Sequence, residues 1–211
     1  DRDHKLIRFL MREKHASPFE HNLFRFHVKC PIAVGREWMR HRWSSFNEHS
    51  LRYSEAIDAF YVPAPEQIRT QTGKPGAYTF EPMEPEVAEK IRGVMDAQYR
   101  QAWETYQSML EQGVAREIAR FVLPVGLYTE FYWTVNARAL MNFIALRNAE
   151  AAMWEIRRYG EAVAAYEAFL RLAPTHADSE RHPAHGHSSS RGRVYANIVG
   201  EACASPTLSP S

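Results

Sequence analysis

The spacing of apolar residues along the chain follows two periods, and each period predicts a different kind of element. Helical spacing, with apolar residues every three or four positions, is clearest near the N-terminus and in a long central segment. We expect helices over 4–14, 32–42, 84–112, 114–121, 137–148 and 149–171. Residues 22–30 instead alternate, with Phe24, Phe26 and Val28 on one face, which predicts a strand with one buried side. Aromatic-rich residues 127–135 predict a second strand, and 60–62 a short third.

Residues that break or cap regular structure mark where these elements end. The stretch His15–Pro18 breaks the first helix, and Pro31 stops the first strand. Gly113 is placed to end the long helix, because glycine adopts the backbone conformation that often follows a helix C-terminus. Asn136 is placed to cap the helix that begins after it. Helices and strands come mixed rather than strictly alternating, which predicts an α+β fold with helices around a small, mostly antiparallel sheet.

The remaining segments lack a clear period. Residues 43–56 are polar and irregular and predict a loop, while 63–85, rich in Pro, Gly and Thr, predicts a surface excursion. We expect one folded domain over 1–173 and a disordered tail over 174–211, where His, Ser, Pro, Ala and Gly dominate. The chain begins without Met, already in helix-like sequence, and we expect it to be a fragment that has lost its first elements.

Composition narrows the function classes. The net charge is +1, so no global charge favours nucleic acid or a membrane, although 26 Lys and Arg residues suffice for a local anion site. Cys30 and Cys203 lie far apart, which argues against a disulfide framework and favours a reducing cytoplasm. We find no apolar run long enough to cross a bilayer. The histidines of the tail lack ordered flanks, so we assign no metal site.

The densest polar cluster lies in residues 36–52 and contains four arginines. Arginine offers a planar fork of donors that matches phosphate and other planar anions, which a lysine does not. Arg40, His41 and Arg42 would also be comfortable as cations at the C-terminus of the preceding helix. Composition alone therefore leaves two interpretations open, an anion-binding site or an ordinary surface.

Single polar residues near this cluster allow several roles. Glu48 is able to form an ion pair with a nearby arginine or to contact a sugar or a base. Ser50 lacks the flanking pattern of a hydrolase nucleophile. Cys30 has no neighbour that would activate a thiolate, so we expect a core or edge thiol. Arg138 and Asn142 share one helix face and are either part of a second binding cluster or the solvated side of that helix.

Several separated motifs together resemble the flavin-dependent thymidylate synthase family. The family pattern is Arg-His-Arg, seven residues and Ser, which stands here as Arg40-His41-Arg42 followed by Ser50. The segment 15–21 resembles the stretch before the family's central strand. Downstream, Val135–Arg138 and 141–147 resemble the second half of the family site. The resemblance covers about residues 4–160 and predicts reductive methylation of dUMP to dTMP, with methylenetetrahydrofolate, NADPH and FAD.

The resemblance also implies roles for individual residues. The FAD site would be lined by Ser17, Arg40, His41, Arg42, Glu48, Asn136, Ala137, Arg138 and Asn142. The dUMP site would be formed by Glu37, Trp38, Met39, Arg40, Glu48, His49, Ser50, Leu51, Arg52, Arg120 and Arg147. Arg147 would be the catalytic residue that polarises the uracil. A cation at the carbonyl edge makes the ring electrophilic, so a flavin hydride needs no Cys nucleophile.

Departures from the family and the family's assembly set further expectations. Many relatives carry Gln where Glu37 stands, and a His where Ala151 stands. The family's N-terminal strand and helix are missing here, and the part after about Tyr159 is shortened and then unrelated. Family members are homotetramers with shared sites, so we expect the same here, with no nucleic-acid partner. The alternatives are a truncated, inactive relative and a non-catalytic nucleotide- or nucleic-acid-binding module.

Overall fold

The computed structural model describes residues 2–172 and 193–198, with side chains described up to residue 165. The chain divides into two compact units, and each is described by itself. Within the described residues, the first unit comprises 2–29, 34–48, 130–172 and 193–198, and the second comprises 30–33 and 49–129. A few elements therefore run from one unit into the other.

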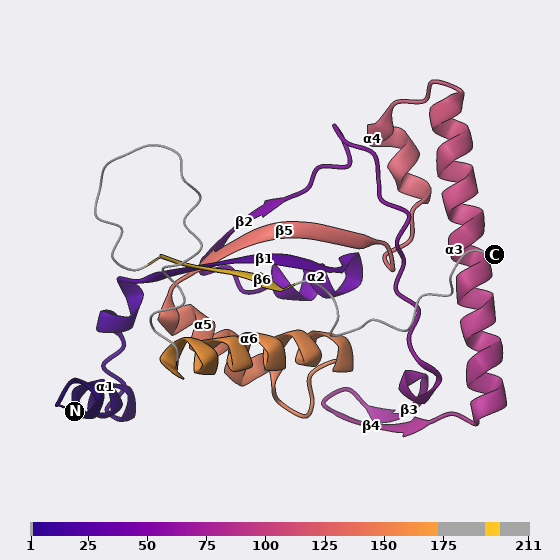
Figure 1. Ribbon diagram of the computed structural model, residues 1–211. Helices are drawn as coiled ribbons and strands as arrows, with labels where there is room; N and C mark the ends of the chain where they lie inside the picture. The colour runs from indigo at the N-terminus through magenta and orange to yellow at the C-terminus, as the bar shows by residue number, and fades with distance from the viewer. Residues whose placement is uncertain (1, 173–192, 199–211) are drawn as a thin grey trace. The chain divides into compact units, whose positions relative to one another are not determined.

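The first unit is built on a four-stranded sheet with the order β2-β5-β1-β6 (Figure 1). The strands are β1 (Leu23–Pro31), β2 (Ser44–Glu48), β5 (Tyr128–Val135) and β6 (Arg193–Ile198). Strands β2 and β5 are antiparallel, with Ser44 opposite Val135, whereas β6 runs parallel to β1. The accompanying helices are α1 (Arg2–Arg12), η1 (Ser17–Glu20), α2 (Ile32–Trp38), α5 (Ala137–Arg147) and α6 (Trp154–Leu172).

An aromatic core fixes α2, α5 and α6 to one face of the sheet. The fully buried ring of Trp38, at the end of α2, lies 5.8 Å from the ring of Phe131 in β5 and 4.7 Å from that of Phe143 in α5. Its ring also lies 5.8 Å from Tyr159 of α6, whose hydroxyl donates to the carbonyl of Lys29 at 3.0 Å. Figure 1 shows α5 and α6 along the same side of the sheet.

The predicted alternation of the first strand is confirmed. Phe26 and Val28 of β1 are buried against the helices, while His27 and Lys29 point to the opposite, partly exposed face. There both approach the Glu130 carboxylate of β5, His27 Nε2 at 3.2 Å and Lys29 Nζ at 3.5 Å. One apolar and one polar face along a strand is the pattern of a sheet that is covered on one side.

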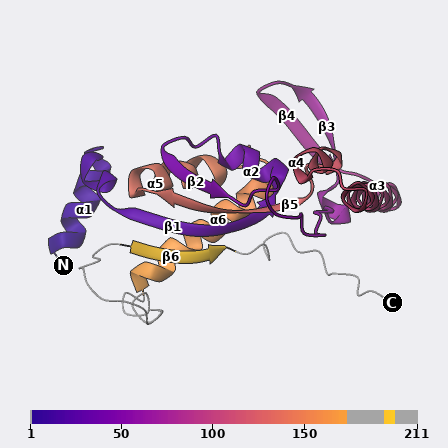
Figure 2. The same cartoon turned by 90° about the horizontal axis from the view of Figure 1, so that it is seen from above.

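The second unit combines a long helix with a two-stranded ribbon. Its elements are η2 (Pro65–Gln67), β3 (Arg69–Lys74), β4 (Ala77–Pro82), α3 (Pro85–Glu111), α4 (Arg116–Ala119) and η3 (Arg120–Val122). Strands β3 and β4 form an antiparallel hairpin with exposed side chains, which extends from one end of α3 (Figure 2). The core gathers around the buried Tyr106, whose hydroxyl accepts from the Ala56 N–H at 3.1 Å.

The α+β class is confirmed, and so are the long helix α3 and its end before Gly113, which has a φ of 80°. The predicted helix 32–42 is too long, because α2 ends at Trp38. The Met39 N–H makes the last hydrogen bond of the α-helical type, to the Gly35 carbonyl. The next two N–H groups, of Arg40 and His41, instead donate to carbonyls three residues earlier, those of Glu37 and Trp38. Arg40, His41 and Arg42 therefore follow the helix instead of forming its last turn.

The predicted loop 43–56 is wrong in its first half, which contains strand β2. This strand lies at the edge of the sheet and buries no side chain completely, so it lacks the apolar alternation that would have revealed it. The excursion 63–85 likewise contains the exposed hairpin β3–β4. The third strand candidate is reduced to one bridge, between Phe60 and Leu127, and α6 begins five residues later than predicted.

Strand β6 lies inside the segment 174–211, and no sequence pattern predicted it. The rest of that segment, including Cys203, is outside the described residues, so the predicted tail remains a prediction. Cys30 is buried in β1, as expected of a core thiol. No helix in the described part of the chain is both long and apolar enough to cross a membrane.

Candidate active site

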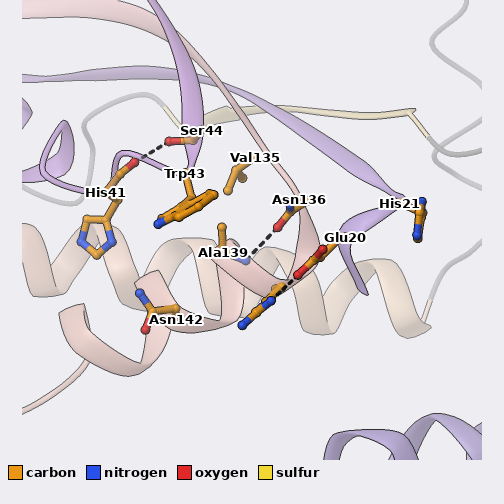
Figure 3. Close-up of a pocket in the computed structure, with 10 residues that line it drawn as sticks. Glu20, His21, His41, Trp43, Ser44, Val135, Asn136, Ala139 and Asn142 are labelled. Carbon is orange, nitrogen blue, oxygen red and sulfur yellow. Dashed lines mark hydrogen bonds and ion pairs between the residues drawn. The ribbon is translucent and has the colours of Figure 1, made fainter. Parts of the chain in front are cut away.

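A pocket of about 700 Å³ opens in the first unit, at the junction of the sheet and the start of α5 (Figure 3). Cavities of roughly 300–1,000 Å³ are typical of small-molecule and cofactor sites. Three segments far apart in the sequence contribute its walls. The lining residues are Glu20, His21, His41, Trp43, Ser44, Val135, Asn136, Arg138, Ala139 and Asn142.

Local hydrogen bonds hold the wall formed by α5. The Asn136 side chain accepts from the Ala139 N–H at 2.9 Å, which confirms the predicted cap and satisfies one of the unpaired donors of the first turn. The Ala137 N–H donates to Oδ1 of Asn22 at 2.8 Å, so the residue directly before β1 is joined to the start of α5. Arg138 pairs with Glu20 across the same junction (Figure 3). The start of α5 is thus fixed beside the pocket.

The opposite wall is formed by the chain between α2 and β2. The Ser44 hydroxyl donates to the His41 carbonyl at 2.6 Å, which closes the turn that presents Trp43. Trp43 is 89% exposed, yet it lines the pocket, and Figure 3 places its ring between His41 and Asn136. A large exposed aromatic ring beside a cavity offers a face on which another planar ring can stack.

The Arg147 guanidinium lies beside this wall and meets three acceptors. Its Nε donates to His41 Nε2 at 2.9 Å, and its Nη1 donates to the Glu37 carboxylate at 3.0 Å. Its Nη2 donates to the Glu37 carbonyl, also at 3.0 Å. The end of α5 is thereby connected to the end of α2 through the side chain that was expected to be catalytic.

His41 belongs to both the pocket and this cluster, and its charge state follows from that position. Burial and, second, the nearby Arg147 lower its pKa from the ordinary 6.5 to about 4. His41 is therefore neutral at pH 7. Because arginine only donates, the Nε2 that accepts from Arg147 carries no proton, and the ring proton resides on Nδ1.

The second unit holds its own group of predicted substrate-binding residues. The Ser50 hydroxyl oxygen accepts from the Arg52 N–H at 3.3 Å, and the Arg52 guanidinium pairs with Glu117 at 2.7 Å. Arg120 Nε donates to the Glu117 carbonyl at 3.2 Å, so both cations gather around Glu117. Leu51 packs against the apolar core of this unit.

Within the first unit, the structure brings together part of the predicted cofactor set. His41, Asn136, Arg138 and Asn142 line the pocket, and Ala137 lies between two lining residues. Ser17, Arg40, Arg42 and Glu48 are not among the lining residues. Met39 and Arg40 follow α2, and His49 follows β2, but the Trp38 side chain is fully buried in the aromatic core.

Six residues that line the pocket were not among the site residues predicted from the sequence. They are Glu20, His21, Trp43, Ser44, Val135 and Ala139. Glu20 and His21 stand in a segment that already carried the family resemblance, so that segment held a usable signal. Trp43 directly follows the Arg-His-Arg run, but an aromatic residue in a predicted loop gives no sign that its ring borders a cavity.

Comparison with known proteins connects this geometry to a family. The family model described as Thymidylate synthase complementing protein matches residues 1–175. A flavin-dependent thymidylate synthase from Thermotoga neapolitana is 48% identical over 183 residues, which span 82% of this chain and 78% of the relative. The chain belongs to the flavin-dependent thymidylate synthase family. As a member of this family, it is an enzyme.

Further members of the flavin-dependent thymidylate synthase family agree. The Streptomyces coelicolor protein of that name is 52% identical over 149 residues, 70% of this chain and 60% of the relative. Among solved structures, the UMP/dUMP methylase PolB from Streptomyces cacaoi, bound with 5-Br dUMP, aligns with a TM-score of 0.71. That alignment has 43% sequence identity and covers 80% of this chain and 74% of PolB.

The pocket residues fit a flavin nucleotide by their chemistry. Trp43 provides a planar apolar face, and Arg138 provides a cation beside it. The Asn142 amide, exposed in the pocket, has no hydrogen-bond partner among the described residues, so it is able to donate to and accept from a ligand. A flavin nucleotide combines planar rings, hydrogen-bonding edges and phosphates, which match these three kinds of group.

Proposed function

We propose that this enzyme converts dUMP to dTMP by reductive methylation, with methylenetetrahydrofolate as carbon donor and NADPH as reductant. The observation that carries the proposal is the pocket, in which His41, Asn136, Arg138 and Asn142 line one cavity in a member of this family. FAD is the cofactor that the family's name and the pocket's chemistry support, and when bound it supplies the hydride carrier.

We propose Arg147 as the residue that activates the pyrimidine. Its guanidinium remains partly exposed, and three of its five N–H donors are engaged among the described residues, which leaves two for a ligand. Two N–H groups directed at a uracil edge would stabilise the negative charge that develops there when a hydride adds to the ring. The acceptors around Arg147 keep this cation in place without removing its charge.

The reaction needs no enzyme thiol in this proposal. Cys30 is fully buried in β1, where its sulfur has no access to a substrate ring. The cationic groups of the site would do the work that a Cys nucleophile does in other thymidylate synthases, because they make the ring electrophilic. The transferred methylene becomes a methyl group with two electrons that come from NADPH.

We further propose that Ser50, Arg52 and Arg120 bind dUMP, with the arginines on its phosphate. The bidentate fork of arginine suits phosphate, and both guanidinium groups are at least partly exposed. Binding of the phosphate, which takes no part in the reaction, would supply the binding energy that holds the pyrimidine ring in a reactive orientation. The family resemblance assigns Arg40 and Glu48 to both ligands, which stays a prediction.

We propose that the working enzyme is a homotetramer whose sites draw on several subunits, and that it works in the cytoplasm. Helix α1 supports association, because it buries no residue within the described chain, although it carries Leu6, Ile7, Phe9 and Met11. An apolar helix face that its own subunit leaves exposed suits burial against another copy. Neither a membrane nor a nucleic acid is part of this proposal.

The test begins with the visible absorption spectrum of the purified protein. We expect a flavin spectrum, release of the flavin on denaturation, and dTMP formation from dUMP, methylenetetrahydrofolate and NADPH. UMP should be assayed in parallel, because the PolB neighbour is named a UMP/dUMP methylase. A colourless protein that takes up no added FAD would refute the proposal. A flavoprotein that forms no dTMP would instead be an inactive relative.

A further inference from the structure

The Arg147 side chain is restrained by more hydrogen bonds than is usual for an arginine at a protein surface. It meets the Glu37 carboxylate, the Glu37 carbonyl and the His41 ring, and only about a fifth of its surface is exposed. A free arginine side chain samples many rotamers, and holding it in one costs entropy, which hydrogen bonds to rigid partners offset. Glu37 lies in the last turn of α2, next to the buried Trp38, and His41 follows the end of that helix by three residues.

We infer that Glu37 and His41 are positioning residues, and that Glu37 acts on the pyrimidine only through the guanidinium of Arg147. This inference rests on the proposed function in so far as Arg147 activates the substrate. It differs from the family expectation, in which the residue at this place contacts dUMP itself. The distinction is physical, because a carboxylate beside an anionic nucleotide would repel it, whereas a carboxylate on Arg147 fixes a cation.

The two acceptors of Glu37 define the plane of the guanidinium. One is the side-chain carboxylate and the other is the main-chain carbonyl, which also accepts from the Arg40 N–H at 3.3 Å. Nη1 and Nη2 are thus held from one side, so the free N–H groups of the fork keep a fixed direction. Loss of the carboxylate would leave the carbonyl as the only acceptor from this residue.

His41 completes the arrangement from the side of the pocket. Its Nε2 accepts from Arg147 Nε, and its ring packs edge-on against Phe143, 4.8 Å between centroids. The ring is able to accept this bond only while it is neutral, because a protonated imidazole has no acceptor. Since His41 also lines the pocket, it connects the pocket wall to the position of Arg147.

The test compares Glu37→Ala with Glu37→Gln, each alone and in an Arg147→Ala background. We expect Glu37→Ala to lower kcat roughly ten- to a hundredfold, the loss typical of a slightly misplaced group, with a much smaller change in the KM for dUMP. Glu37→Gln keeps an oxygen acceptor at the same place and should restore most of kcat. In the Arg147→Ala background, Glu37→Ala should cause no further loss, because the group it positions is absent.

Glu89→Ala is the matched control. Glu89 pairs with Nη1 of Arg92 at 2.8 Å on α3, so this variant removes the same kind of ion pair at a residue that neither lines the described pocket nor belongs to the predicted site. We expect its kcat and KM to equal those of the unmodified enzyme. A Glu37→Ala loss that is undiminished without Arg147, or that appears mainly in the KM for dUMP, would overturn the inference and indicate direct substrate contact.

A second measurement does not depend on turnover. The Nε–H of Arg147, bonded to His41, should exchange slowly with water and give an NMR cross-peak at neutral pH that Arg147→Ala removes. We expect Glu37→Ala to abolish this peak, and Glu37→Gln and Glu89→Ala to retain it. A peak that survives Glu37→Ala would show that Glu37 does not position Arg147, even if the protein proved unable to make dTMP. Absent turnover with the expected NMR pattern would refute the proposed function alone.

Discussion

Arg147 is the last residue of α5, and its side chain reaches acceptors more than a hundred positions earlier in the chain. The sequence shows it only as one arginine in a second polar cluster, because periodicity reports which face of a helix is polar and not what that face meets. The family resemblance supplied its expected role. The structure adds the partners, which no spacing rule encodes.

Arg147→Ala is expected to impair methylation far more than flavin binding. Removing one preorganised donor group to a developing anion typically lowers kcat by roughly 10²- to 10³-fold. Arg147 is not among the residues that line the pocket, so the flavin absorbance per subunit should remain close to that of the unmodified protein. Steady-state dTMP formation and the flavin spectrum measure the two effects. Unchanged turnover would remove Arg147 from the reaction.

His41 makes a prediction about stability and pH. Its pKa is lowered in the folded chain to about 4, by burial and by Arg147, so the unfolded chain binds this proton more readily. The stabilisation from a neutral His41 is complete above about pH 6.5 and is lost as the pH falls towards 4. Denaturant unfolding at pH 7 and pH 4.5 should therefore show less loss of stability for His41→Asn than for the unmodified protein.

The control for this measurement is His4→Asn, at an exposed position of α1. It should retain the pH dependence of the unmodified chain. An identical pH dependence in the two variants would mean that His41 is not the group whose protonation opposes folding.

Helices α5 and α6 pack closely at one particular glycine. A Cβ atom on Gly160 would lie 2.3 Å from Asn148 Oδ1 and 3.2 Å from Arg147 Cβ. The Asn148 oxygen is buried, and the Arg147 main-chain carbonyl carbon lies 3.3 Å from the same Cβ, so a methyl group at Gly160 would press on the end of α5. The position of Arg147 therefore depends on a residue of α6 that has no side chain.

Gly160→Ala should consequently destabilise the fold and reduce turnover together. Overpacking of this kind costs about 1–3 kcal/mol. Gly93→Ala is the matched control, since Gly93 lies on the exposed surface of α3 and a Cβ there meets nothing within 4 Å. It should stabilise the protein by about 0.5–1 kcal/mol, because alanine is the better helix former. Denaturant midpoints of both variants test this, and a neutral Gly160→Ala would contradict the packing argument.

The sequence predicted elements well where burial imposed a period on them. Strand β1 alternates because one side is covered, and α3, α5 and the Asn136 cap follow from helical spacing and capping chemistry. Strand β2 was not predicted because it lies at the edge of the sheet and buries no side chain completely. Strand β6 was not predicted because its segment shows no regular alternation of apolar and polar residues. The same limit applies to the pocket, since Trp43 and Ala139 become neighbours only through long-range pairing.

At the scale of the whole molecule, helix α1 requires an explanation. Its apolar residues occupy one side of the helix and its basic residues, including Arg8, the other. Leu6 is 54% exposed and Phe9 44% exposed, which leaves a continuous apolar face of the helix in contact with water. Association with further copies of the chain would remove this surface from water.

Leu6→Asp should therefore weaken the assembly, because it would bury a charge without a partner in the interface. Size-exclusion chromatography with light scattering should show a shift towards smaller species, together with loss of flavin if sites are shared. Arg8→Asp, which also introduces an aspartate but on the opposite side of α1, should keep the original mass. If both variants kept that mass, α1 would not be part of the interface.

Strand β2 explains why the number of residues between Arg42 and Ser50 matters. Five of them, Ser44–Glu48, form the strand, which spans about 17 Å at the usual rise per residue. Its pairing with β5 fixes where each end of that length falls, with Ser44 opposite Val135 and Glu48 opposite Phe131. Adding or deleting one residue would turn every following side chain to the other face of the sheet. The length of the segment between Arg42 and Ser50 is therefore constrained by strand pairing as strictly as the residue types at its two ends are constrained by their chemistry.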